Sequence, residues 1–326
     1  MQAAITGGTG FVGSHIARLL IAEGHRVRVV HRATSRLDAL DSLDYDGVVA
    51  DILDEDALRP AFAGCEWVFH VAAIADYWRA DKARMMEANV EGTRRVLRAA
   101  KDAGVARVVF TSSAAAVGTR ADGQPADESD FFHDSAARFP YAYSKLLAEQ
   151  VVQEAVQTGQ DVVIVNPVVI FGPGDLNMIS GSMFKEVKRF GRFTTVASGG
   201  IAVIDVRDVA RGHLAAATKG RTGERYILGT QNIALRDLLP LVAEVVGVGR
   251  PIVYVPDFAL SPIATAFGFA RRLGINTPVD PNQIRMGSRH IYFDFTKMHT
   301  ELGEPQISLR QSLEDTYRWY VEHGYL

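Results

Sequence analysis

The stretch QAAITGGTGFVGSHIARLLIAEGHRVRVV, residues 2–30, decides the fold class of this 326-residue chain. Its pattern predicts a short apolar strand, a turn with glycine at positions 7, 10 and 13, an amphipathic helix and a second strand. Glycines let the backbone turn tightly and approach a pyrophosphate, and the helix N-terminus supplies amide donors and positive potential. In this context the turn predicts a dinucleotide site rather than a plain strand-to-helix connection.

The chain continues as alternating strands and helices to about residue 175. Apolar runs predict further strands near residues 48–51, 67–73, 107–113 and 161–167. Between them, Asp54 is placed to cap a short helix, and residues 81–103 are expected to form a long one. The run at 161–167 is almost entirely apolar, which is typical of a parallel strand buried on both faces.

We therefore predict an α/β fold with a doubly wound, Rossmann-like parallel sheet. Residues 1–175 are expected to form the dinucleotide-binding domain, and residues 176–326 a smaller α/β substrate lobe. Strand and helix segments of residues 200–230 are expected to return to the first domain.

Composition narrows the classes of partner. The net charge is -3 and there is no long basic run, which argues against nucleic acid. A single cysteine, Cys65, excludes an internal disulfide, and the sequence shows no Cys/His cluster at ligand spacing, so we expect no metal site. No apolar run reaches the length that spans a bilayer, and the sequence opens without a signal-peptide pattern. We expect a cytoplasmic protein without stable membrane insertion.

The candidate for acid–base chemistry is the segment Tyr-Ala-Tyr-Ser-Lys, residues 141–145. Tyr141 and Lys145 are four residues apart, so a helix would present both from one face, and Pro140 suits the first turn of that helix. We expect the lysine cation to favour the phenolate and lower the pKa of Tyr141 towards neutral pH. Chance alone often supplies this spacing, so its weight comes from the glycine turn upstream.

Gly-x-x-Gly-x-x-Gly followed by Tyr-x-x-x-Lys resembles the extended and atypical members of the short-chain dehydrogenase/reductase superfamily. These include the NAD-dependent epimerase/dehydratases and the dihydroflavonol-4-reductase-like reductases. Residues 223–229 are also similar to a hopanoid-associated epimerase-type branch. The resemblance is specific over residues 1–175 and looser over 176–326.

The resemblance implies a catalytic set and a cofactor set. The catalytic residues would be Ser113, Tyr141 and Lys145, with Ser112 as the alternative to Ser113. Asp51 and Ile52 would hold the adenine, and Asn89 would bond backbone and keep its helix in register. The full cofactor set is Gly7, Thr9, Gly10, Phe11, Val12, Gly13, Arg32, Ser35, Asp51, Ile52, Ala72, Ala73, Asn89, Tyr141, Lys145 and Pro167.

The end of the second strand predicts which cofactor is preferred. Sites that prefer NAD place Asp or Glu here to hold the ribose hydroxyls. This chain has Arg32 instead, and no carboxylate occurs before Asp38. Arg32 can form charge-assisted hydrogen bonds to a 2′-phosphate, and Ser35 can add one. We therefore favour NADP(H), with NAD(H) as the alternative.

Aromatic residues mark the expected substrate side. Tyr77 and Trp78 lie just beyond the predicted cofactor loop, where they would either cover the sheet edge or line a pocket for an apolar substrate. The polar loop 119–139, with His133 after two phenylalanines, is expected to form part of the entrance. Ile201 stands where many nucleotide-sugar enzymes have an arginine.

Three functional hypotheses follow. The first is an NADPH-dependent carbonyl reductase that acts on an apolar or aromatic small molecule. The second is a nucleotide-sugar epimerase or dehydratase that uses bound NAD(P). The third is a non-catalytic, NADP-sensing binding protein, which is disfavoured because Tyr141 and Lys145 are both present. A homodimer is common in the resembled family, and the sequence leaves the oligomeric state open.

Overall fold

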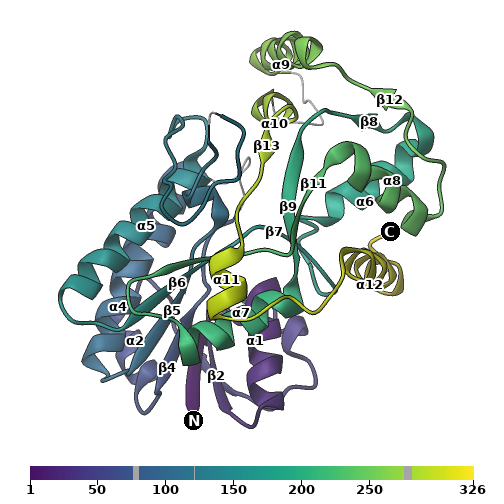
Figure 1. The fold of residues 1–326 in the computed structure, drawn as a ribbon. Coiled ribbons are helices and arrows are strands. Elements are labelled where there is room, and N and C mark those ends of the chain that lie inside the picture. The colour runs from purple at the N-terminus through teal and green to yellow at the C-terminus, as the bar shows by residue number, and fades with distance from the viewer. Residues whose placement is uncertain (76–80, 121, 275–280) are drawn as a thin grey trace.

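A seven-stranded parallel sheet forms the centre of the computed structural model, which describes residues 1–75, 81–120, 122–274 and 281–326 (Figure 1). Its strand order is β10-β6-β5-β4-β1-β2-β3, and every pairing within it is parallel. The strands are β1 (Gln2–Thr6), β2 (Arg26–His31), β3 (Asp46–Val49), β4 (Trp67–His70), β5 (Arg107–Thr111), β6 (Val162–Pro167) and β10 (Arg225–Leu228). The predicted doubly wound α/β class is confirmed.

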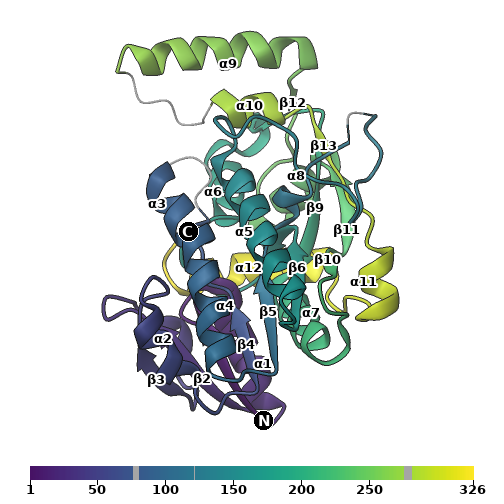
Figure 2. The same ribbon diagram turned by 90° about the vertical axis from the view of Figure 1, so that its left-hand side faces the viewer.

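Helices cover both faces of this sheet. On one face lie α1 (Phe11–Ala22) and α7 (Val206–Lys219), and on the other lie α2 (Glu55–Phe62), α4 (Gly92–Asp102) and α5 (Pro140–Gln157). Figure 2 shows α4 and α5 in front of the sheet. In β6, Val163 and Val165 pack on the first side, whereas Val162 and Ile164 pack on the second. Side chains alternate along a strand, so two covered faces explain the unbroken apolar run.

Strand order sets the place of the ligand crevice. From β1 the chain builds outward to β2 and β3, then crosses to the other side of β1 and continues through β4, β5 and β6. In such sheets ligands bind beyond the carboxyl ends of the strands where the order reverses. Here that place lies between β1 and β4, at the turn that starts with Gly7.

The remaining segments build a second body of structure. One sheet contains β7 (Val169–Phe171), β9 (Gly200–Asp205), β11 (Gln231–Ala234) and β13 (His290–Ile291), and β8 (Thr195–Val196) pairs with β12 (Val253–Tyr254). The helices are α6 (Gly181–Phe190), α8 (Leu235–Val246), α9 (Asp257–Arg272), α10 (Pro281–Met286), α11 (Thr296–Glu301) and α12 (Leu309–Glu322). A separate apolar cluster packs α6, α8 and α12 together.

Residues 200–230 divide between the two sheets. The strand β9 belongs to the second sheet, while β10 pairs with β6 and α7 packs beside α1. A domain boundary near residue 175 stays a prediction. Among the helices that the structure describes, none combines the length and apolar composition needed to cross a bilayer.

The predicted long helix over 81–103 contains an irregularity. Regular helix α3 (Lys82–Met86) leads into a π-helical segment, Glu87–Glu91, before α4 begins. Such segments are rare and often occur at functional sites. Asn89, one of the predicted cofactor-site residues, lies at the centre of this segment.

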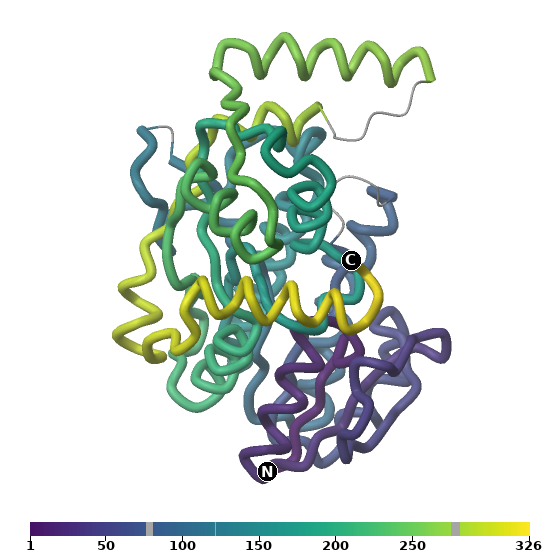
Figure 3. The backbone as a smooth tube through the Cα atoms, turned by 90° about the vertical axis from the view of Figure 1, so that its right-hand side faces the viewer, coloured from purple at the N-terminus to yellow at the C-terminus, as the bar shows by residue number. Residues whose placement is uncertain are grey.

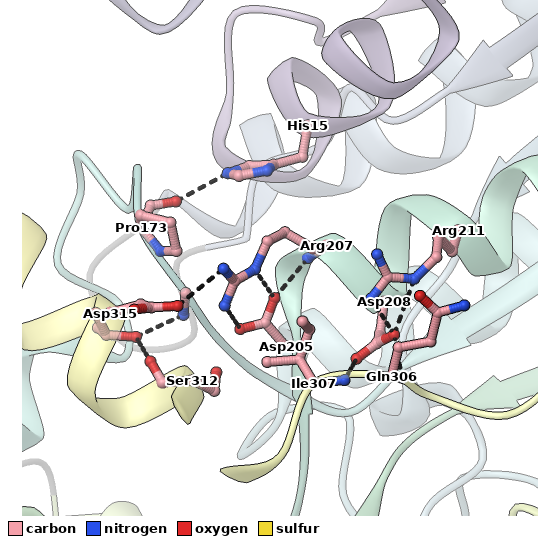
Figure 4. Close-up of polar contacts among 12 residues, drawn as sticks. His15, Pro173, Asp205, Arg207, Asp208, Arg211, Gln306, Ile307, Ser312 and Asp315 are labelled. Atoms are coloured by element: carbon pink, nitrogen blue, oxygen red, sulfur yellow. Dashed lines mark hydrogen bonds and ion pairs between the residues drawn. The ribbon is translucent and has the colours of Figure 1, made fainter. Parts of the chain in front are cut away.

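Partly buried ion pairs join α7 to the C-terminal helix. Arg207 lies 2.8 Å from Asp205 at the start of α7 and 2.8 Å from Asp315 on α12. Figure 4 shows these three side chains together, with His15 of α1 pointing at the Pro173 carbonyl nearby. In Figure 3, α12 crosses between the N-terminal strands and helices and the later segments. These contacts tie the second body of structure to the first helix of the sheet.

Asp208 fixes the segment that leads into α12. Its carboxylate is 1% exposed and accepts hydrogen bonds from the backbone N–H groups of Gln306 at 2.7 Å and Ile307 at 3.0 Å. Arg211 also donates to it (Figure 4). The carboxylate therefore satisfies two backbone donors that lie about a hundred residues away along the chain.

We predict that Asp208→Ala lowers the free energy of unfolding by about 2–4 kcal/mol, because it leaves two backbone donors and one guanidinium unpaired. Urea denaturation followed by circular dichroism measures this change. The exposed Glu322, replaced by Ala, serves as the control and should change stability by less than about 0.5 kcal/mol. Equal stability of the two variants would contradict the role given to Asp208.

Candidate active site

The glycine turn between β1 and α1 forms a backbone cradle. Gly7 has φ +72°, and a Cβ placed on it would lie 2.6 Å from the Ala72 backbone nitrogen. A Cβ on Gly13 would lie 2.3 Å from the Gly7 carbonyl oxygen. Gly10 is the N-cap of α1, with no side-chain hydrogen bond to the first-turn amides and no acidic residue in that turn. The cradle therefore fits the pyrophosphate of a dinucleotide, since its amide donors and positive potential face the crevice.

The turn after β2 presents a cation. Arg32 is exposed, and its backbone N–H donates to Ser35 Oγ at 3.1 Å, so Ser35 shapes the turn. The neighbouring Arg36 is paired with Asp38 at 2.7 Å. After the next strand, exposed Asp51 accepts a hydrogen bond from the Leu53 N–H at 2.9 Å. These residues fit the adenosine end of a dinucleotide, with an arginine where NAD sites have a carboxylate.

Asn89 holds the loop that follows β4. Its Oδ1 accepts from the Ile74 N–H at 2.8 Å, and its Nδ2 donates to the Ile74 carbonyl at 3.1 Å and to Ser144 Oγ at 2.9 Å. The side chain thus bonds both backbone groups of the loop and also α5. Within this loop Ala72 lies against Gly7 and precedes Ala73, so Asn89 positions the predicted cofactor-loop backbone.

His70 is part of the packing beneath that loop. Its ring nitrogens lie 2.8 Å from Thr6 Oγ1 and 3.1 Å from Thr93 Oγ1, and it is 1% exposed. Burial lowers its pKa to about 3, so the ring is uncharged at neutral pH. The histidine, which is the last residue of β4, therefore has a structural role.

The predicted catalytic residues converge at the carboxyl end of β5. Ser113 follows that strand, and its hydroxyl hydrogen-bonds the Tyr141 side chain, which lies in the first turn of α5. Tyr141 is 6% exposed and Lys145 is 3% exposed. The alternative Ser112 instead donates to Glu149. The geometry therefore brings Ser113, and not Ser112, to the phenol.

The expected effect of Lys145 on Tyr141 is wrong for this structure. The Lys145 ammonium donates to the Thr111 carbonyl at 2.8 Å and lies 5.2 Å from the Phe110 ring centroid. Burial raises the pKa of Tyr141 to about 12, and the Ser113 hydrogen bond lowers it only in part. Burial also lowers the pKa of Lys145 to about 8. At neutral pH the phenol consequently keeps its proton, as a proton donor must.

Within the residues that the structure describes, the remaining predicted site residues make no hydrogen bond that bears on the proposed chemistry. Pro167 is buried at the end of β6, and Ile52 packs against Gly92 in the first turn of α4. His133 is exposed, with Nδ1 3.3 Å from the Phe131 carbonyl. The predicted substrate residues Tyr77 and Trp78 lie outside the described residues.

A buried polar group that is not predicted from the sequence lies next to the lysine. Glu149, Asn166 and Arg225 are buried together, from α5, β6 and β10. Asn166 Nδ2 donates to the Ser113 carbonyl at 3.0 Å and to Glu149 at 2.6 Å. The signal available in the sequence was the position of Glu149, one helical turn after Lys145.

Comparison with known proteins gives concordant matches. The sequence model of the NAD dependent epimerase/dehydratase family matches residues 3–229. A Synechocystis sp. protein named "Putative dihydroflavonol 4-reductase" is 40% identical, over 99% of this chain and 95% of that protein. The sterol demethylase protein B of Methylococcus capsulatus is 32% identical, over 99% of both chains.

A solved structure shares the architecture. It is PA4631, described as a nucleoside-diphosphate-sugar epimerase from Pseudomonas aeruginosa, with 27% identity and a TM-score of 0.82. The match covers 100% of this chain and 99% of that one. Both reductases and sugar epimerases are thus named among the similar proteins.

We predict that Tyr141 stays protonated at a pH where ordinary tyrosines ionise. With a pKa of about 12 only about 1% of it is tyrosinate at pH 10, whereas a free tyrosine is about half ionised there. The absorbance at 295 nm, followed from pH 8 to 12 for the native protein minus Tyr141→Phe, isolates this group. Ser113→Ala removes the hydrogen bond that favours the phenolate and should move the transition still higher. A tyrosinate signal centred near pH 10 that Tyr141→Phe abolishes would disprove the assignment.

Proposed function

Because the chain belongs to the NAD-dependent epimerase/dehydratase family, with its short-chain dehydrogenase/reductase fold, we propose that it is an NADPH-dependent carbonyl reductase. The family and the relatives support NAD(P)-dependent oxidoreduction. The finer proposal is carried by one observation, the buried and protonated Tyr141 that shares a hydrogen bond with Ser113 at the sheet's carboxyl edge. A protonated phenol is ready to give a proton to a carbonyl oxygen.

Each residue of the site has a role in this reduction. When bound at the glycine turn, the dinucleotide would supply the hydride for the carbonyl carbon. Tyr141 donates its phenolic proton to the carbonyl oxygen, so a ketone or aldehyde becomes an alcohol. Ser113 donates a hydrogen bond to that oxygen and fixes its position between the two hydroxyls. Lys145 would hold the ribose next to the nicotinamide.

The preference for NADP(H) rests on the turn after β2. Arg32 and Ser35 offer a guanidinium and a hydroxyl, while Arg36 is occupied by Asp38. A guanidinium binds a phosphate through charge-assisted hydrogen bonds. These bonds are stronger than those that it can donate to uncharged ribose hydroxyls. NAD(H) remains the alternative cofactor.

We propose an apolar or aromatic substrate. Ile201 lies in β9 where a sugar-nucleotide site would need an arginine, and a charged ligand requires a compensating charge when it is buried. Two similar proteins carry names that refer to a dihydroflavonol and a sterol, and neither of these molecules carries a formal charge. Contact of Tyr77, Trp78 and His133 with the substrate stays a prediction.

The second candidate is a nucleotide-sugar epimerase or dehydratase. The family description and the Pseudomonas aeruginosa structure favour it. Such an enzyme would keep its dinucleotide bound and consume none. A non-catalytic NADP sensor is the third candidate, and the Ser113–Tyr141 hydrogen bond next to buried Lys145 argues against it. Cytoplasmic location, a homodimer and the absence of nucleic-acid partners stay predictions.

We predict that the purified protein oxidises NADPH in the presence of apolar ketones or aldehydes, measured by the loss of absorbance at 340 nm. Tyr141→Phe should lower kcat by at least about a hundredfold and leave NADPH binding within about twofold, because only the proton donor is removed. Tightly retained NAD without net NADPH consumption would refute the reductase and favour the epimerase. An active Tyr141→Phe variant would refute the assigned donor.

We predict that Arg32→Asp weakens NADPH binding on the order of ten- to a hundredfold, because a carboxylate would face the 2′-phosphate. NADH binding should stay equal or improve, since a carboxylate can accept from both ribose hydroxyls. Fluorescence titration measures both dissociation constants. Arg26→Asp, at the opposite end of β2, is the control for the change in net charge. Equal losses for the two cofactors would contradict a phosphate contact.

A further inference from the structure

Glu149 is a buried acid that the proposed mechanism does not use. It lies on α5 one turn after Lys145 and is 3% exposed. A carboxylate is rarely buried unless it is paired, because removal from water costs several kcal/mol. Its neighbours must therefore account for it.

In the described part of the chain, the Glu149 carboxylate has two side-chain hydrogen bonds and one ion pair. Oε1 accepts from Ser112 Oγ and from Asn166 Nδ2, the latter at 2.6 Å. Oε2 lies 2.9 Å from Nε of Arg225. An ionised carboxylate accepts only, so the donors of Ser112 and Asn166 and the guanidinium of Arg225 match its charged form. Burial raises the pKa of Glu149, whereas Arg225, Ser112 and Asn166 lower it.

Arg225 connects this carboxylate to the predicted entrance loop. Its Nη1 donates to the carbonyls of Glu128 at 3.1 Å and Asp130 at 2.8 Å. Its guanidinium lies 4.7 Å from the centre of the Phe131 ring. Because Arg225 itself is on β10, it joins three parts of the fold: the catalytic helix, the edge strand of the main sheet and the loop that precedes Tyr141.

The charges around Lys145 give Glu149 a function. Burial disfavours the ammonium, and Glu149 is the neighbouring charge that favours it. Two other ionisable groups of the described residues face this part of the site and are uncharged at neutral pH: Tyr141 on the same helix, with its raised pKa, and His70 on β4. From β10, Arg225 faces Glu149.

We propose that Glu149 is a positioning residue that acts through Lys145: its carboxylate, one turn further along α5, keeps the lysine charged while the Thr111 carbonyl receives the ammonium. Arg225 holds that carboxylate and links it to the entrance loop. The functional meaning rests on the proposed function, in which Lys145 holds the cofactor ribose. The electrostatic effect of Glu149 on Lys145 does not depend on the proposed function, and it can be measured without cofactor.

The test is the titration of Lys145 in the free protein. Lysine labelled with carbon-13 at Cε gives an NMR signal for each side chain, and the signal that Lys145→Met lacks is that of Lys145. In the native protein the midpoint should lie near pH 8. In Glu149→Gln, which keeps the shape and loses the charge, the midpoint should fall by roughly one pH unit or more. The exposed Glu154→Gln on the same helix is the matched control and should leave it unchanged.

Glu149→Gln leaves Arg225 without its counter-ion, and this variant could fail to fold for that reason. A second variant therefore removes both charges. The double variant Glu149→Gln with Arg225→Met removes both charges and leaves neither unpaired. Its Lys145 midpoint should also lie well below the native one. An unchanged midpoint in whichever variant folds would overturn the proposal.

The pH dependence of NADPH binding distinguishes this role from a purely structural one. Loss of an ion pair that only stabilises the fold would not change the shape of that pH dependence. Fluorescence titration of the native protein should show weaker binding above about pH 8. In Glu149→Gln that loss should begin at lower pH, with affinity at pH 6 within about threefold of native, because the lysine is still charged there. Equal weakening at every pH would indicate a structural role only and refute the proposal. Failure of the native protein to bind NADPH would refute the cofactor assignment and leave the NMR result unaffected.

Discussion

A buried lysine ammonium is the constraint on which the candidate site depends. Lys145 is 3% exposed, so it needs a hydrogen-bond acceptor and a counter-charge within the protein. The acceptor is the Thr111 carbonyl at the end of β5, and the counter-charge is Glu149 on the next turn of α5. Glu149 in turn requires Arg225 from β10. The strand order β10-β6-β5 places these groups beside one another, so the sheet supplies what the lysine requires.

The fold could be predicted because its signals are local or periodic. The strand, glycine turn and helix of residues 2–30 lie within one short segment, and the unbroken apolar run of β6 follows from burial on both faces of the sheet. The spacing of Tyr141 and Lys145 likewise depends only on helix geometry. The π-helical segment around Asn89 could not be predicted, because the clamp between the loop at Ile74 and Ser144 of α5 joins three separate parts of the chain.

Three-dimensional packing decides one point about the site that the sequence left open and overturns one expectation. Ser112 and Ser113 are adjacent at the end of a strand, so their side chains leave on opposite sides. One side chain reaches Glu149 and the other reaches Tyr141. The pKa of Tyr141 could not be predicted from its lysine partner, because burial outweighs the cation when the ammonium is directed at Thr111. Arg225 lies 76 residues beyond Glu149, and only the pairing of β10 with β6 brings them together.

The protonated phenol bears on the direction of the chemistry. Reduction uses the proton that Tyr141 already holds, and the transfer becomes favourable once the hydride has made the carbonyl oxygen an alkoxide, a stronger base than a phenolate. A sugar epimerase begins instead by oxidising an alcohol, which requires a base that has first lost its proton. In a site where burial raises the pKa of the tyrosine, that loss is costly unless a cation moves next to the phenolate. Lys145 would have to leave the Thr111 carbonyl to do so. The position of the Lys145 ammonium therefore sets how readily Tyr141 can act as a base as well as an acid.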